Sequence, residues 1–409
     1  MNPRTFRWAM GAGWLIVGAT LALFEVSRSR PARAADEDPK VPAGEVKLSG
    51  PYSHENLTIF LVHGEDKFDA SKLLTLEEAL DQKTAVVHET GSVNELAVEN
   101  LSKDVEVFIQ SGDIVKGGRQ DRLISFSTIV PARSGKVSVP AFCVEHGRWQ
   151  QRGKEVATRF GSSTSQLPSK ALRINGGAYA QLGGNQGFAG GNLGLGGGNQ
   201  GNGNNQGLAG NFIGYGGANQ GFGANLGNGG GNQGMVWSEV SAFQQKLTKN
   251  AGGEVRAKDS PSSLQLTLES KNVKEAIDNY IKKLAPIVER HEDVIGYAFA
   301  IDGKINSAEV FGSAALFKKL WPKLLRANAI EALAELQKGK KVDPVPMDAV
   351  KACLLDAEHD RTRRDLVLVQ KALTKRIVVS VQETDQSIFV ETRDHDRKGA
   401  WIQRSYVTK

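Results

Sequence analysis

Two short polar stretches of the sequence hold residue types that could bind an anion or move a proton. The first, SGDIVKGGRQDR at 111–122, combines acidic and basic side chains with glycines: Asp113, Lys116, Arg119, Asp121 and Arg122. Its glycines at 112 and 117 have the spacing of a phosphate-binding P-loop. However, Gly118 and Arg119 stand where that loop needs Lys and then Ser or Thr, so the nucleotide-hydrolysing mechanism lacks its two working groups.

The second stretch, CVEHGRW at 143–149, adds a carboxylate, an imidazole, another guanidinium and an indole. Alternation along a strand would put Cys143 and Glu145 on the same face. If the two stretches meet, cations would hold a phosphate-like anion while Glu145 or His146 moves a proton. We therefore predict an anion site formed by Lys116, Arg119, Arg122 and Arg148, supported by Asp113, Asp121 and Trp149. The alternative stays open that the same residues are structural ion pairs tying hairpins together.

No other catalytic or metal-binding motif stands out in the sequence. Candidate metal ligands are present but lack a recognised spacing, so we predict no metal site; they are His54, His63, His88, His146 and the trio Asp394-His395-Asp396. Residues 394–399 are better explained as a turn. No G-x-S-x-G serine motif occurs, and no cofactor can be named.

The first 34 residues have the layout of a secretory signal peptide. Arg4 and Arg7 precede an uncharged run at 8–24, and Ala32-Arg33-Ala34 offers a small-residue cleavage site. The run is short against the roughly 20 residues that a spanning helix needs. We predict cleavage of residues 1–34 and export to the periplasm or another extracytoplasmic compartment. An uncleaved membrane anchor at 8–24 is the alternative.

The net charge of +6 comes mainly from this leader. Residues 1–34 hold five arginines and one glutamate, so the rest of the chain carries only +2. The basic pI is therefore poor evidence for nucleic-acid binding, and we expect no nucleic-acid partner. The two cysteines, Cys143 and Cys353, lie far apart in the sequence, which excludes a disulfide framework and favours buried thiols.

Residues 174–238 contain no Asp, Glu, Lys or Arg and hold 25 of the 46 glycines, in repeats such as GGNQGFA and GGNLGLG. Glycine disfavours a helix by about 1 kcal/mol per residue, and too few apolar side chains are present to offset the ordering entropy. We predict a flexible insert, with self-association through Asn and Gln side chains as the alternative. Because a long loop adds little closure entropy, it can interrupt a single domain.

The sequences on either side of this insert predict an α+β fold. Residues 35–173 are strand-rich and include one short helix that Thr75 and Glu78 would cap. Residues 239–409 are expected to form the second part of the same domain. The first predicted element is a helix at 273–288, which Asn272 and Glu275 would cap and Pro286 would end or kink. A hairpin turn at Asp302-Gly303, a helix at 313–333 and three closing strands follow.

Four stretches follow one another along the chain: SGDIVKGGRQDR, VPAFCVEHGRW, QGMVWSEV and VIGYAFAIDGKINSAEVFGSAALFKKLWPKLL. In this order they resemble the landmarks of the domain family named for its association with ADP-ribosylglycohydrolase and rhodanese-phosphatase proteins. The resemblance runs from about residue 45 to the C-terminus. The family has no established reaction, and its name implies a genomic context of NAD and ADP-ribose metabolism. The glycine-asparagine insert and the export signal depart from the family pattern, and export would separate the chain from cytoplasmic NAD.

These observations lead us to expect an exported cell-envelope protein that is a binding or structural module. The alternative is an enzyme or ligand-binding protein for a phosphate-containing small molecule related to ADP-ribose or NAD. An anionic small molecule is the expected partner. Membrane contact is expected only through an uncleaved N-terminal segment.

Overall fold

The structure is a computed structural model that describes residues 46–176, 231–359, 366–369 and 376–409, apart from residues 93, 154 and 385. The predicted signal peptide, the alternative membrane anchor and most of the predicted insert lie outside these residues. Among the described helices, none is long and apolar enough to cross a membrane.

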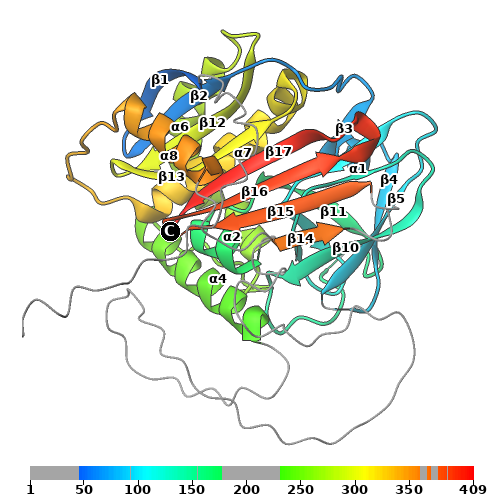
Figure 1. Cartoon of the computed structure of the whole chain (residues 1–409). Coiled ribbons are helices and arrows are strands. Elements are labelled where there is room, and N and C mark those ends of the chain that lie inside the picture. The colour runs from blue at the N-terminus through cyan, green and yellow to red at the C-terminus, as the bar shows by residue number, and fades with distance from the viewer. Residues whose placement is uncertain are drawn as a thin grey trace, which may run out of the picture. The chain divides into compact units, whose positions relative to one another are not determined.

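An antiparallel sheet of eight strands joins both parts of the chain (Figure 1). Its strands are, in spatial order, β1 (Lys47–His54), β2 (Leu57–His63), β12 (Val294–Ile301), β13 (Lys304–Phe311), β17 (Ala400–Thr408), β16 (Ser387–Asp394), β15 (Ile377–Glu383) and β14 (Leu366–Val369). The turn between β12 and β13 uses Asp302 and Gly303 at φ values of 52° and 77°, which this residue pair tolerates. The predicted hairpin and the three closing strands are therefore confirmed.

Two smaller sheets are built from the N-terminal part. Six strands form one sheet in the order β11 (Phe160–Gln166), β7 (Asp113–Gly117), β8 (Arg122–Ile124), β10 (Gly135–Cys143), β5 (Glu95–Asn100) and β4 (Ala85–Glu89). Three strands form the other, in the order β3 (Leu73–Thr75), β6 (Glu106–Ile109) and β9 (Thr128–Val130). The stretch 111–122 is thus the β7–β8 hairpin, and the stretch 143–149 begins at the end of β10.

One long helix connects the sheets. The described helices are α1 (Leu76–Asp81), α2 (Lys170–Gly176), α4 (Gly231–Asn250), α5 (Leu264–Leu268), α6 (Lys271–Leu284), α7 (Ala314–Glu335) and α8 (Met347–His359), with short 3-10 turns η1 (Ala285–Ile287) and η3 (His395–Arg397). Helix α7 packs against β12, β11, α4 and α6. Alternate residues of β2 serve two cores: Ile59 belongs to the main core with α7, and Phe60 to a smaller core with α8. The predicted α+β class is confirmed.

Local helix signals were only partly correct. The predicted cap of α1 is confirmed, because the Thr75 hydroxyl accepts from the Glu78 N–H while the Glu78 carboxylate accepts from the Thr75 N–H. The predicted cap of α6 at Asn272 is wrong. Ser270 is the N-cap, and the Asn272 amide instead donates to the Glu254 carbonyl at 3.0 Å. Helix α4 starts at Gly231, inside the segment predicted as a flexible insert.

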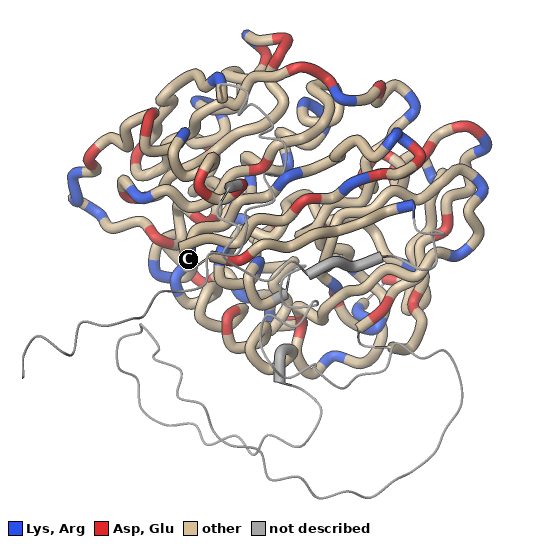
Figure 2. Tube along the Cα trace, viewed as in Figure 1, with Lys and Arg blue, Asp and Glu red and all other residues tan. Residues whose placement is uncertain are grey.

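Charges of both signs are spread over the sheets and helices of the described chain, as Figure 2 shows. At 394–399 the predicted turn contains η3, where the Asp394 carboxylate accepts from the Asp396 N–H. The same carboxylate binds the Arg376 guanidinium through two hydrogen bonds of 2.9 and 2.8 Å. Because positive and negative side chains are intermixed, the charge distribution alone does not mark a binding site, and the pairing of individual side chains decides where one lies.

Candidate functional site

Strand pairing brings the two polar stretches together, because Cys143 at the end of β10 lies opposite Arg122 at the start of β8. The β7–β8 turn uses Gly117 and Gly118 at φ values of 111° and 52°. A Cβ added at Gly118 would lie 2.2 Å from the Phe160 ring. The two glycines are therefore explained by a tight turn under an aromatic ring, without a phosphate.

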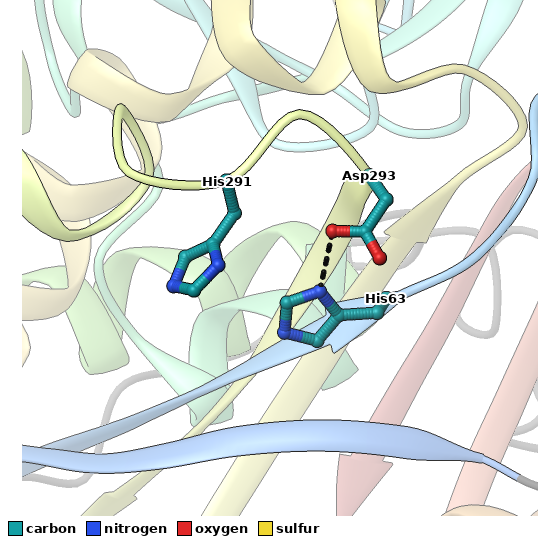
Figure 3. A group of neighbouring side chains, drawn as sticks. All are labelled: His63, His291 and Asp293. Atoms are coloured by element: carbon teal, nitrogen blue, oxygen red, sulfur yellow. Dashed lines mark hydrogen bonds and ion pairs between the residues drawn. The ribbon is translucent and has the colours of Figure 1, made fainter.

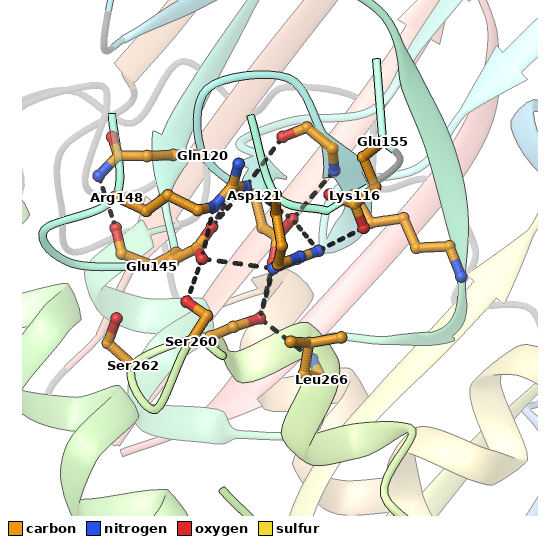
Figure 4. A network of polar contacts seen from close by, with 12 residues as sticks. Lys116, Gln120, Asp121, Glu145, Arg148, Glu155, Ser260, Ser262 and Leu266 are labelled. Atoms are coloured by element: carbon orange, nitrogen blue, oxygen red, sulfur yellow. Dashed lines mark hydrogen bonds and ion pairs between the residues drawn. The ribbon is translucent and has the colours of Figure 1, made fainter. Parts of the chain in front are cut away.

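A buried ion network forms where the hairpin meets the loop after β10 (Figure 4). It consists of two carboxylates and two guanidinium groups: Asp121, Glu145, Arg148 and Arg152. The Arg148 Nη2 lies 2.6 Å from the Glu145 Oε2, and the Arg152 Nη1 lies 3.0 Å from the Asp121 Oδ2. The same Arg152 nitrogen lies 3.3 Å from the Glu145 Oε1. Glu155 adds a third, part-exposed carboxylate 2.8 Å from the Arg152 Nη2, so each guanidinium of the network is paired.

Two serines fasten this network to the segment before α5. The Ser263 hydroxyl donates to the Asp121 Oδ2 at 2.7 Å and accepts the Leu266 N–H as the N-cap of α5. The Ser260 hydroxyl donates to the Glu145 carboxylate. Because these contacts join residues more than 100 positions apart, the network holds the hairpin against the second part of the domain.

The two carboxylates of the network differ in their protonation behaviour. Burial raises the pKa of Asp121, the neighbouring Glu145 charge raises it further, and Arg152 opposes the shift. For Glu145, burial also acts upward, but hydrogen bonds from Arg148, Ser260 and the Asp121 N–H outweigh it and lower its pKa. Glu145 is thus a charged anchor with both oxygens engaged, which does not suit a proton-transfer group facing solvent.

Beside the network lies a second group, which we call the Arg–Trp surface: Arg119, Arg122 and Trp149. The guanidinium carbons of Arg119 and Arg122 lie 5.7 and 5.6 Å from the centre of the Trp149 ring, within cation–π range. Arg119 is exposed, and Trp149 is 43% exposed. Among the described residues, no carboxylate forms an ion pair with the Arg119 guanidinium.

Arg122 is a buried arginine whose hydrogen-bond donors are only partly used. Its side chain is completely buried, and its Nη1 donates to the Cys143 Sγ at 2.9 Å and the Gln120 carbonyl at 3.3 Å. Its Nε and Nη2 have no hydrogen-bond acceptor among the described groups. The nearest carboxylate oxygen, Glu89 Oε2, lies 3.5 Å from Nη2, which gives attraction without hydrogen-bond geometry. Burial raises the pKa of the Cys143 thiol to about 11, so this sulfur is a neutral thiol near pH 7.

The remaining predicted residues are engaged elsewhere. The Lys116 ammonium binds the Glu269 carboxylate at 3.1 Å, and the Asp113 carboxylate binds the Lys323 ammonium at 2.7 Å. His146 is exposed, with its ring centre 4.4 Å from that of Trp237. The structure therefore joins Asp121, Glu145 and Arg148 in one group and Arg119, Arg122 and Trp149 in the other.

The comparisons with known proteins identify the family of this chain. The sequence model of the ARG and Rhodanese-Phosphatase-superfamily-associated Protein domain matches residues 45–407. The chain belongs to this family. No curated protein and no solved structure matches the chain significantly. In this member of the family, residues of the stretches 111–122 and 143–149, together with Arg152, form the ion network and the Arg–Trp surface.

Sequence reasoning missed the partners of the predicted residues. Arg152 carries a signal, since it follows Arg148 by four residues in a stretch that also holds Glu155, but a charged stretch more often lies on the surface. Ser260 and Ser263 carry none, because their role depends on a contact made only after folding. Glu89 lies on β4, in the part of the chain that the sequence predicts only as strand-rich.

A separate cavity of about 420 Å³ lies between α2, α4 and the β12–β13 hairpin. Four lysines and four acidic residues line it, and several of them pair with each other. The Lys246 ammonium lies 2.7 Å from the Glu335 carboxylate, and the Lys340 ammonium lies 3.7 Å from the Asp302 carboxylate. Because these charges balance, the cavity selects neither anions nor cations as clearly as the Arg–Trp surface does.

Proposed function

We propose that this protein is an exported binding module that takes a phosphate-containing or other anionic small molecule at the Arg–Trp surface. The observation that carries the proposal is the completely buried Arg122, whose Nε and Nη2 donate no hydrogen bond although Nη2 lies 3.5 Å from the Glu89 carboxylate. A buried polar group without a partner is costly, and each such group in a native protein calls for an explanation. An oxygen of an anionic ligand would supply the missing acceptor.

The neighbouring residues suit such a ligand. Arg119 adds an exposed guanidinium, which binds phosphate or carboxylate oxygens through paired hydrogen bonds. The Trp149 indole lies within cation–π range of both arginines and is partly exposed, and we infer that a ligand reaches Arg122 by displacing this ring. The same ring could stack on a flat group of the ligand, such as a nucleobase. The ion network beside it serves as a frame, because its charged groups are paired with one another.

The proposal is binding without catalysis. Glu145 accepts hydrogen bonds on both oxygens, and Cys143 is a neutral thiol, so neither is poised to react. Export is the second half of the proposal. It rests on the arginines, the uncharged run and the small-residue site within residues 1–34.

Thermal-shift and calorimetric titrations of the mature protein test the binding proposal, with ADP-ribose, NAD and inorganic phosphate as probes. A ligand at 100 times its Kd stabilises the folded protein by about 2.7 kcal/mol, a shift that is easily measured. We expect Arg119→Ala and Trp149→Ala each to weaken binding by at least tenfold. Their melting temperatures without ligand should stay close to wild type, because both side chains are exposed.

Arg133→Ala is the matched control, since it removes an exposed arginine before the opposite end of β10 and should leave binding unchanged. The proposal fails if the wild-type protein binds none of the three probes. It also fails if the two site variants bind a probe as tightly as wild type.

A further inference from the structure

A second cluster of polar side chains lies at the eight-stranded sheet, where three side chains converge: His63, His291 and Asp293 (Figure 3). One possible ligand atom of each lies within 4.8 Å of the other two. Strand pairing explains the convergence. His63 ends β2, and its partner in the neighbouring strand is Val294, which directly follows the short segment that carries His291 and Asp293.

We propose that these three residues bind a divalent transition-metal ion of the zinc class. Two imidazole nitrogens and one carboxylate oxygen are a usual protein ligand set for zinc, with bonds of about 2.0–2.2 Å. Ligand atoms in such a tetrahedral site are roughly 3.4 Å apart. The His63 Nδ1 already lies 2.8 Å from the Asp293 Oδ1, so only modest movement is needed. The Asp293 side chain is 48% exposed and lies just before β12, which leaves it room to adjust.

Hydroxyl groups from β1 support both imidazoles. The Ser49 Oγ lies 2.7 Å from the His63 Nε2, and the Tyr52 hydroxyl lies 3.4 Å from the His291 Nε2. Metal-binding histidines usually donate their other ring N–H to such a partner, which fixes the ring orientation. Metal on the His63 Nδ1 requires its proton to be on Nε2, from where it donates to the Ser49 oxygen.

The same atoms also line up as Ser49, His63 and Asp293, the order of a serine-hydrolase triad. Two observations favour the metal. The orienting aspartate of a triad is buried, whereas Asp293 is half-exposed and also lies 3.4 Å from the exposed Lys47 ammonium. A triad gives no role to His291, yet this imidazole converges on the other two ligands. Three protein ligands leave one coordination position for water, as in zinc sites that are open to substrate.

Zinc titration of the untagged mature protein, stripped with a chelator, tests the site. We expect one zinc ion per chain by calorimetry and elemental analysis, and at least 100-fold weaker binding in His291→Ala and in Asp293→Asn. His88→Ala is the matched control, because that imidazole binds Glu99 at 2.9 Å instead and its loss should not affect zinc. Circular dichroism would show that the variants are folded, and Asp293→Asn is the milder change should His291→Ala fail to fold.

Three results would overturn the proposal. The first is a wild-type protein that takes up less than one zinc ion per chain. The second is unchanged affinity in folded Asp293→Asn and His291→Ala variants. The third is labelling of the metal-free protein by a fluorophosphonate, with loss of the label in Ser49→Ala, which would assign the residues to a hydrolytic triad.

Discussion

Arg152 gives the sharpest test of the ion network. Its guanidinium reaches the carboxylates of Asp121, Glu145 and Glu155, and its side chain is almost completely buried. In Arg152→Met, the chain keeps an apolar side chain of similar length, but Asp121 and Glu145 are left with Arg148 alone. One negative charge is then buried without compensation. Breaking a buried pair from one side costs about 3–5 kcal/mol, a large part of the 5–15 kcal/mol that stabilises a typical domain.

Urea unfolding of the mature protein at pH 7, followed by circular dichroism, measures this loss. Arg393→Met is the matched control: its ion pair with Glu391 is partly exposed, so the loss should stay below about 1 kcal/mol. The double variant Arg152→Met with Asp121→Asn should recover much of the stability, because it removes the unpaired charge together with its partner. A loss below about 1 kcal/mol in Arg152→Met would refute the assignment of the network as a structural frame.

The pH dependence separates electrostatics from packing. Burial and Glu145 raise the pKa of Asp121, and Arg152 opposes them. Without Arg152, the folded-state pKa of Asp121 rises further above its unfolded value, so the folded state binds more protons. The stability deficit of Arg152→Met should therefore shrink as the pH falls from 7 toward 4. A deficit that stays constant over this range would point to lost packing instead of charge.

Three further outcomes are expected. Replacing residues 178–229 by a short Gly-Ser linker should change the free energy of unfolding by about 1 kcal/mol or less, because each doubling of loop length costs only about 0.6 kcal/mol. Extending the deletion through Gln233 removes part of α4 and should destabilise the domain in urea. Burial acts to raise the pKa of Asp394, but the ion pair with Arg376 outweighs it and lowers the pKa. The stability from this pair is present above the unfolded-state pKa of about 3.9 and is lost as the pH falls through the lower folded-state pKa. In Asp394→Asn, the urea midpoint should no longer fall over this acidic pH range. Intact-mass measurement of the exported protein should place its N-terminus near Ala35, and an uncleaved chain in the membrane fraction would support the anchor instead.

Local features of the fold were predictable where neighbouring residues decide them. The Asp302-Gly303 turn depends on two adjacent residues that tolerate positive φ, and the Thr75–Glu78 cap is made within one helical turn. The cap of α6 was mispredicted because Ser270 and Asn272 are both good capping residues two positions apart. In such a case, the contact of the Asn272 amide with Glu254 decides between them, and this contact forms only in the folded chain.

The site was predictable in its location but not in its pairing. Residue types alone indicated that 111–122 and 143–149 carry compatible charges, and the β8–β10 pairing brings them together. The predicted shared face of Cys143 and Glu145 does not apply, because β10 ends at Cys143 and strand alternation stops there. Lys116 was expected in the anion site, yet its partner Glu269 lies 153 residues further along the chain. Pairing over such separations is set by packing.

The side chain of Gln233 bears on whether molecules of this protein can associate through strand pairing. On one side of β10, pairing with β5 stops at Pro140, and Gln233 then takes over both backbone groups of Cys143: the Cys143 N–H donates to its Oε1 at 3.0 Å, and its Nε2 donates to the Cys143 carbonyl at 2.7 Å. An open strand end invites pairing with another chain. This glutamine belongs to the last GGNQG repeat, whose amides could make the same bonds between molecules. By closing the strand end within its own chain, Gln233 occupies the backbone N–H and C=O of Cys143, which another molecule would otherwise need for edge-to-edge pairing.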